Sequence, residues 1–382
     1  MGGHALIRIG SRQRSVEVGG ATDWPFAIER AVERMVDART TRKTGEYRRI
    51  RGCTYCPGAT IRASIFEIPK KAQLDDREEE GRRDDGLIPE CRPSREELRL
   101  LRLGRASPLM ARTSGRLEIP IGLIDGPVAL DHPDLAAENI REVPGKLPAA
   151  CGDAGHAACA HGTFIAGILL ARRMSVAPAI CPGCSLLVRP IFSEAPADGE
   201  QMPSASAEDL ADAIVAVIQA GARIINLSVA LQGPSPRGGR GLQEALDFAL
   251  RCGVVVVAAA GNQSAVGSSA ITGHPWVIPV IAYDLRGRPM HLSNLGASIG
   301  RCGLGAPGEA VNSLGVTNPL TMGGTSAATP FVTGAVALTW SEFPDATAAE
   351  VRYAITRAAA PRRTTIVPPL LNAWASYELM SK

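Results

Sequence analysis

The sequence of 382 residues contains no long hydrophobic run. Its longest apolar stretch, VVVVAAA at 254–260, is far shorter than the roughly 20 residues that a membrane-spanning helix needs. The N-terminal stretch MGGHALIRIGSRQRSVEV also lacks the apolar segment and cleavage-site pattern of a secretory signal. We therefore expect no membrane partner and a cytoplasmic location.

The cysteines do not form the even set that is typical of a disulfide framework. There are 9 of them, scattered along the chain, and without an export signal they favour reduced thiols. Two pairs, Cys53/Cys56 and Cys181/Cys184, have the C-x-x-C spacing and could together bind one zinc ion. Neither pair has a supporting His or further Cys nearby, so packed or incidental thiols are the alternative.

A strong excess of charge of one sign is also missing. Acidic and basic residues are interleaved in runs such as DDREEEGRRDD at 75–85, so the charge does not indicate a nucleic-acid partner. Charged residues number 39 among the first 105 residues and 40 among the remaining 277. This shift predicts a boundary near residue 105, between a charged extension (1–105) and a second domain (106–382).

Within the extension, two segments have the pattern of strands, ALIRI at 5–9 and IRASIFEI at 61–68. TDWPFAIERAVERMV at 22–36 has the cap, the early proline and the apolar face of a helix. The extension could therefore be a small αβ unit. The alternative is a loosely ordered extension without such a role.

From residue 117 onward, short apolar strands alternate with amphipathic helices. Apolar strands are predicted at 119–125, 185–192, 223–231, 254–262 and 277–284. Helices are predicted from His161, after a cap at Ser206, and over 242–251. Such repetition indicates an α/β fold with a mostly parallel central sheet that is covered on both faces. Ligands of such sheets bind at the carboxyl ends of the strands.

Four polar residues lie at strand ends or helix starts. Asp125 ends the first predicted strand, His161 opens a helix, Asn262 follows VVVVAAAG, and Ser326 stands in MGGTSAATP. A serine becomes a nucleophile when a histidine takes its proton and a carboxylate holds that histidine. Asn262 and the N–H of Ser326 could stabilise the resulting oxyanion. Taken singly, each residue is more often structural, but the four together point to nucleophilic catalysis.

The segment around Ser326 combines glycines and small residues with the apolar face of a helix. Gly323 and Gly324 allow a tight turn and let another molecule approach. One interpretation is a close contact between core helices. The other is a serine at a helix N-terminus, where N–H groups favour developing negative charge.

The motifs IGLIDGPVALDHPDL (121–135), HGTFIAGIL (161–169), AAAGN (258–262) and GGTSAATP (323–330) resemble those of the subtilisin-like serine proteases. The resemblance covers about residues 106–382 and implies the subtilisin-like three-layer fold. It implies Asp125, His161 and Ser326 as the catalytic residues of a serine endopeptidase and Asn262 as the oxyanion donor. The implied substrate-binding positions are Ser228, Val229, Ala230 and Leu231, as an edge strand for the peptide, and Gly273 at the base of the primary specificity pocket.

The aspartate motif departs from the common subtilase pattern. Most members have Ser or Thr and then Gly after the catalytic Asp, whereas this chain has Asp125-Gly126-Pro127 and lacks that hydroxyl. This variant is similar to that of the cyanobactin maturation proteases, which cut segments from ribosomally made peptides. The resemblance therefore implies a peptide or protein substrate and precursor-peptide processing. In such a protease, an αβ unit within residues 1–105 could be an inhibitory prosegment or a substrate-recognition module.

Two other functions remain open from the sequence. One is a catalytically inactive pseudoprotease that binds peptides, and the other is a general intracellular degradative protease.

No cofactor is expected. No calcium site is expected either, because 168–178 contains no Asp, Asn or Glu, and Arg172 and Arg173 could pair with Asp134 instead. A pocket with Gly273 at its base and Ala258–Ala260 as walls predicts uncharged, apolar residues before the scissile bond.

Overall fold

The structure, a computed structural model, describes most of the chain after residue 99. Its described residues are 100–102, 104–153, 155–194, 204–231, 239–358 and 365–382, with the backbone alone for 3–9, 12–18, 60–63 and 230–231. The central element is a seven-stranded sheet in the order β12-β11-β10-β8-β4-β6-β5, and every adjacent pair is parallel. Its strands, in chain order, are β4 (Pro120–Asp125), β5 (Ile140–Glu142), β6 (Ser185–Pro190), β8 (Ile224–Leu227), β10 (Val255–Ala259), β11 (Ile278–Tyr283) and β12 (Leu304–Pro307).

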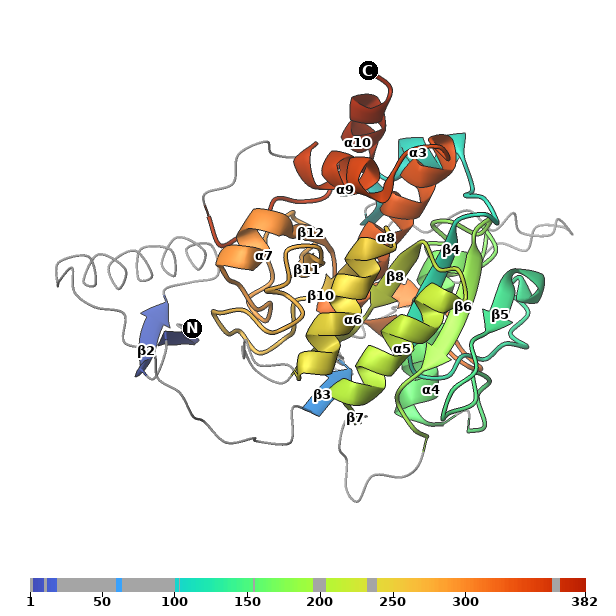
Figure 1. Ribbon diagram of the computed structural model, residues 1–382. Coiled ribbons are helices and arrows are strands. Elements are labelled where there is room, and N and C mark those ends of the chain that lie inside the picture. The colour runs from blue at the N-terminus through green and yellow to red at the C-terminus, as the bar shows by residue number, and fades with distance from the viewer. Residues whose placement is uncertain are drawn as a thin grey trace, which may run out of the picture.

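Helices cover both faces of this sheet, as the apolar strands predict (Figure 1). On one face α4 (Ala157–Leu170) and α8 (Thr325–Glu342) pack against the strands, and on the other face α5 (Ala207–Gln219) and α6 (Arg240–Arg251) do so. Because side chains alternate along each strand, neighbouring residues enter different cores: Leu123 packs on the α8 side and Ile124 on the α5 side. The predicted α/β three-layer fold is confirmed.

The remaining elements complete the domain. Three short helices, α3, α9 and α10, pack together next to the C-terminal half of α8 (Figure 1). The bounds are α3 (Ser107–Arg112), η2 (Ala137–Asn139), α7 (Ala297–Cys302), β13 (Val311–Ser313), β14 (Leu320–Met322), α9 (Ala348–Arg357) and α10 (Ala373–Met380). No helix among the described residues is long and apolar enough to cross a membrane.

One of the predicted helix starts agrees with the structure, and another differs from it. Helix α5 begins as expected, because Ser206 and Asp209 form a reciprocal capping box and Gly221 follows its end with φ +96°. Helix α4 begins earlier than predicted. It starts at Ala157, with the ring of His156 accepting the N–H of Ala158, so His161 lies in its second turn rather than at its start.

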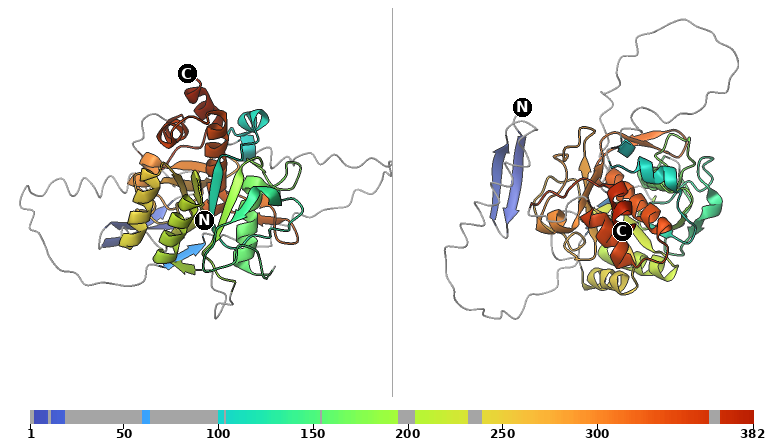
Figure 2. Two further views of the ribbon diagram at one scale, coloured as in Figure 1. Left: turned by 45° about the vertical axis from the view of Figure 1, so that its right-hand side comes forward. Right: turned by 90° about the horizontal axis from the view of Figure 1, so that it is seen from above.

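A small separate sheet contains one strand from the N-terminal extension. Strand β3 (Thr60–Ala63) lies between β7 (Ser204–Ser206) and β9 (Val229–Leu231) and is antiparallel to both. In Figures 1 and 2 this blue strand lies beside β7, below the central sheet. Strands β1 (Gly3–Ile9) and β2 (Arg12–Val18) form an antiparallel pair of their own.

The strands expected in the extension are thus present in part, as β1 and β3. The helix expected at 22–36 and the pair Cys53/Cys56 lie outside the described residues. Leu100 and Leu101 are already buried in the core on the α8 side, so this core begins slightly before the expected boundary near residue 105.

Candidate active site

Asp125 and His161 form a buried pair at the carboxyl edge of the central sheet. Asp125 ends β4, and its Oδ1 lies 2.6 Å from Nδ1 of His161 on α4. Both side chains are at most 1% exposed. Within the part of the chain that is described, His161 Nε2 has no hydrogen-bond partner, so this ring nitrogen remains available as a base.

In the turn after Asp125, a backbone donor binds one of the two carboxylate oxygens. The N–H of Gly126 donates to Asp125 Oδ1 at 2.7 Å, whereas Oδ2 is buried and has no partner among the described residues. A Cβ on Gly126 would lie 2.0 Å from the carbonyl oxygen of Ala158, and one on Gly162 would lie 2.2 Å from that of Pro127. Two glycines therefore allow the aspartate turn to approach the helix that carries His161.

Ser326 lies in the first turn of α8 and is 2% exposed. The residue before the helix, Gly324, has φ +106°, which a side chain rarely allows. A Cβ at Gly324 would also lie 2.7 Å from Asn262 Nδ2. The glycine before the helix is thus required both by its conformation and by the approach of Asn262.

Asn262 is held by the residue that precedes Ser326. Its Oδ1 accepts hydrogen bonds from the N–H of Thr325 at 3.0 Å and from Thr325 Oγ1 at 2.9 Å. Since the oxygen is engaged by two donors, the amide nitrogen is the end that can face a ligand oxygen. The structure therefore links the candidate oxyanion donor to the start of α8.

Asn294 supports the loop that carries Asn262, and the sequence reasoning missed it. Its Nδ2 donates to Ala260 O at 3.0 Å and to Gln263 Oε1 at 2.6 Å, and its Oδ1 accepts from the N–H groups of Gln263 and Ala265. A buried asparagine with four hydrogen bonds fixes the loop on both sides of Asn262. No local spacing identifies this contact, because Asn294 is distant along the chain.

A second buried network connects the predicted substrate edge to Ser326. Thr333 donates to Asn226 Oδ1 at 2.7 Å, Asn226 Nδ2 donates to Ser228 Oγ at 2.9 Å, and Ser228 Oγ donates to the carbonyl oxygen of Ser326 at 3.0 Å. Asn226 and Thr333 were also missed. The sequence pattern places Asn226 in an apolar strand and Thr333 in an apolar helix, and it indicates no further role for either residue.

The predicted substrate positions are not all in one place. Ser228 lies between β8 and β9, and the next three residues, Val229–Leu231, form β9 and pair with β3. Gly273 lies in an exposed turn between β10 and β11, where its N–H donates to Ser269 O at 2.9 Å. The role of Gly273 in a specificity pocket remains a prediction.

The cysteines near the site differ from the expectation of reduced thiols. Cys151 and Cys159 form a disulfide, with their Cα atoms 5.6 Å apart, and Cys159 is two residues before His161. The chain separation of these cysteines matches no motif, and the expectation rested on the absence of an export signal. Cys181 and Cys184 are buried free thiols, and the hydrogen bond with Cys184, followed by burial, raises the pKa of Cys181.

A metal site needs several ligand atoms in one place. Only Cys151, Cys159 and Glu194 group closely enough among the described residues, and the disulfide uses both of these sulfurs. The expected ion pair with Asp134 is not formed within the described part. Instead, Arg173 donates to the backbone carbonyls of Met110 and Thr113, while the N–H of Arg172 bonds the backbone oxygen of Asp134.

Comparison with known proteins agrees with this geometry. The profile of the subtilase family, Peptidase_S8, matches residues 118–372. Subtilisin DY of Bacillus licheniformis is 31% identical over 255 residues, which cover 65% of this chain and 86% of that protein. Subtilisin E of Bacillus subtilis (strain 168) is 30% identical over 246 residues, which cover 61% of this chain and 58% of that protein.

Solved structures give the same result. The protease domain of PatA, in a mutant form, matches with a TM-score of 0.63 and 29% identity, covering 70% of this chain and 96% of that one. The prenylagaramide maturation protease PagA matches with a TM-score of 0.63 and 25% identity, covering 72% of this chain and 99% of that one. The chain belongs to the subtilase family and is a subtilisin-like serine protease.

Proposed function

We propose that Asp125, His161 and Ser326 are the catalytic residues of this serine endopeptidase and that Asn262 is its oxyanion donor. The observation that carries this assignment is the buried 2.6 Å contact between Asp125 Oδ1 and His161 Nδ1, which leaves Nε2 available. A carboxylate on Nδ1 selects the tautomer whose Nε2 accepts a proton. It also stabilises the imidazolium that then forms.

The reaction follows from these roles. His161 Nε2 takes the proton of Ser326 Oγ as that oxygen attacks the peptide carbonyl. The negative oxygen of the tetrahedral intermediate accepts hydrogen bonds from Asn262 Nδ2 and the N–H of Ser326, at the positive end of α8. His161 then donates its proton to the leaving amine. Water, activated by the same histidine, hydrolyses the acyl-enzyme.

The peptide substrate is proposed to bind as an extended strand between β7 and β9. The backbone of β3 supports this proposal, because it pairs with both strands in an antiparallel register. The C-terminal residue of β3, Ala63, is opposite Val229. The residue before Val229, Ser228, donates a hydrogen bond to the carbonyl oxygen of Ser326. A strand in this position therefore runs toward the proposed nucleophile.

The same strand suggests a role for residues 1–105, with 106–382 as the peptidase domain. Because β3 uses the edges that a substrate strand would use, the extension would compete with substrate. An inhibitory segment fits this position better than a recognition module, which would leave the edges open. In this proposal, displacement of β3 or cleavage shortly after Ala63 opens the cleft.

The proposed biological reaction is the processing of a ribosomally made precursor peptide. It is supported by the likeness to the maturation protease PagA and to the PatA protease domain, and by the Asp125-Gly126-Pro127 motif. A cleft that accepts one extended strand suits an unfolded peptide. General protein degradation is the competing function, and the two differ in the number of bonds that are cut.

Labelling of the full chain with a fluorophosphonate tests the catalytic assignment. We expect covalent labelling of the unmodified chain and none of Ser326→Ala. Equal labelling of both would overturn the assignment, and a complete lack of labelling would favour a peptide-binding pseudoprotease.

For the biological role, a peptide encoded next to the gene should be cut at one or two bonds, whereas casein should stay largely intact. Extensive cleavage of casein would indicate a degradative protease.

A further inference from the structure

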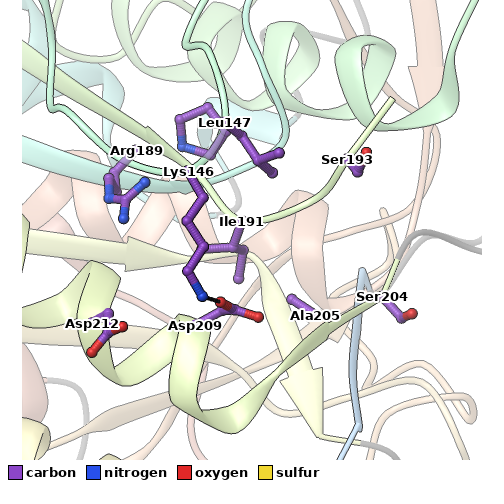
Figure 3. A pocket seen from close by; sticks show the side chains of 10 residues that line it. Lys146, Leu147, Arg189, Ile191, Ser193, Ser204, Ala205, Asp209 and Asp212 are labelled. Atoms are coloured by element: carbon purple, nitrogen blue, oxygen red, sulfur yellow. Dashed lines mark hydrogen bonds and ion pairs between the residues drawn. The ribbon is translucent and has the colours of Figure 1, made fainter. Parts of the chain in front are cut away.

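A cavity of about 230 Å³ lies beside β7, between the end of β6 and the start of α5 (Figure 3). Its polar lining residues are Lys146, Arg189, Ser193, Ser204, Asp209 and Asp212. Figure 3 shows Lys146 reaching down to Asp209, with Arg189 on one side and Ser193 and Ser204 on the other. The cavity is separate from the catalytic pair but begins next to it, because Pro190 is in register with Asp125.

Arg189 is a buried cation that pairs with no carboxylate among the described residues. It is 8% exposed, and its Nε is buried without a hydrogen bond to any described residue. Its neighbours on the same side of β6, Leu187 and Ile191, belong to the apolar core on the α5 side. Burying a guanidinium without a partner destabilises a fold, so this arrangement needs a reason.

The backbone leaves room for this guanidinium. A Cβ at Gly145 would lie 1.3 Å from Arg189 Nη1, so the guanidinium occupies the space that a side chain at that position would fill. Any other residue at 145 would displace Arg189. The guanidinium therefore packs directly against the backbone at Gly145.

The nearby carboxylates do not neutralise Arg189. Asp209 accepts hydrogen bonds from Lys146 Nζ at 2.6 Å and from Ser206 Oγ at 2.7 Å, and these contacts lower the pKa of Asp209. Lys146 balances the charge of Asp209, and Asp212 is exposed on the next turn of α5. Of the two cations in the lining, Arg189 is the one that forms no ion pair with a described residue.

The position of the cavity beside β7 indicates which group could supply a carboxylate for Arg189. Ser204 and Ala205 line it and also form β7, the strand that pairs with β3. The four residues of β3 are Thr, Ile, Arg and Ala, so this strand brings no carboxylate. A substrate peptide in the place of β3 would also pair with β7. If it carried an acidic residue opposite Ser204 or Ala205, the side chain of that residue could extend past β7 to Arg189.

We propose that this cavity is a subsite for an acidic side chain of the peptide substrate and that Arg189 is its specificity-determining residue. The inference rests on the proposed function of the cleft. The planar guanidinium matches a carboxylate and can bind it through two parallel hydrogen bonds. Occupation by an Asp or Glu side chain would pair the buried charge and distinguish acidic peptides from their amides.

The test uses pairs of fluorogenic peptides that differ only by Glu or Gln at one position, scanned through the residues before the scissile bond. For the full chain we expect kcat/KM to favour Glu at one position by about tenfold, the effect of one charge-assisted hydrogen bond. In Arg189→Met this ratio should fall to about one, whereas Arg189→Lys should retain part of it. No preference for Glu at any position, or the same preference in Arg189→Met, would overturn the subsite.

Two further measurements distinguish a failure of the proposed subsite from a failure of the proposed catalytic residues. Peptide binding to a variant that combines Ser326→Ala with Ile61→Pro, which weakens the pairing of β3, should show the same ratio without cleavage when it is followed by fluorescence anisotropy. This measurement tests the subsite even if the catalytic assignment fails. Equal or absent binding of the two peptides would contradict the subsite. The melting temperature of Arg189→Met should stay the same or rise, because an unpaired buried charge is removed. A fall of several degrees would show that Arg189 is a structural residue.

Discussion

The hydroxyl of Ser228 donates a hydrogen bond of 3.0 Å to the carbonyl oxygen of Ser326. In a regular helix that carbonyl would accept the N–H of the residue four positions later, but this residue is Pro330, which has none. The proline inside α8 thus releases the carbonyl of the proposed nucleophile, and the residue next to β9 binds it. The peptide-binding edge and Ser326 are joined in this way.

Replacing Ser228 with Ala should therefore reduce activity as well as stability. It removes a buried hydrogen bond, which stabilises the fold by about 0.5–1.5 kcal/mol. We expect kcat/KM to fall because the edge strand and Ser326 are no longer joined. Ser341→Ala is the matched control, since Ser341 also donates to a carbonyl of α8, that of Ala337, but in the C-terminal half of the helix. Urea denaturation and peptide kinetics on both variants would test this, and an equal loss of kcat/KM in both would contradict it.

Single replacements of Ser326 or His161 by Ala should each lower kcat by several orders of magnitude. The double variant should be little worse than either single variant, because the residues act as a unit. Peptide hydrolysis with active-site titration measures this. Near-normal turnover by Ser326→Ala would show that another residue is the nucleophile.

Asn262→Ala should lower kcat by about 10²–10³ with KM almost unchanged, because the oxyanion forms only during the reaction. Thr325 would also lose its two contacts with Asn262 Oδ1. Asn262→Asp keeps an oxygen for Thr325 but removes the donor, so it should be as inactive as the alanine variant. Recovery of activity in Asn262→Asp would indicate that Asn262 positions Thr325 rather than the oxyanion.

Ile61→Pro in the full chain should raise the initial rate of peptide cleavage. Proline removes an N–H from β3, which is paired on both sides, with Ala205 and with Leu231. Ile61→Val is the control, since it keeps the N–H and suits a strand. Mass spectrometry of the unmodified chain should also detect a cut shortly after Ala63. Equal rates for both variants would argue against competition by β3.

Activity should survive treatment with EDTA. Calcium binds six to eight oxygen ligands, and residues 168–178 offer no acidic or amide side chain. The measurements are the melting temperature and peptide cleavage with and without EDTA. A decrease of more than a few degrees that calcium but not zinc reverses would demonstrate a site.

The sequence predicts the sheet and its covering helices because apolar strands and capped helices are local patterns. It also predicts Asp125 and His161 as partners, through motifs that resemble those of the subtilases. The contacts of Asn294 and the disulfide between Cys151 and Cys159 could not be predicted in this way, since they depend on how separate loops pack. The burial of Arg189 without an ion pair to any described residue likewise follows from the packing and from no motif.

The contact between the aspartate turn and α4 limits how this chain can vary. Gly126 stands where most subtilases carry a hydroxyl residue, yet a Cβ there would lie 2.0 Å from the carbonyl oxygen of Ala158. A single change to Ser or Thr would therefore move α4 and His161 with it, before the new hydroxyl could bind Asp125. The common form of the motif is not one mutation away from this protein, and an exhaustive substitution screen should find Gly126 and Gly162 as intolerant as the reacting residues.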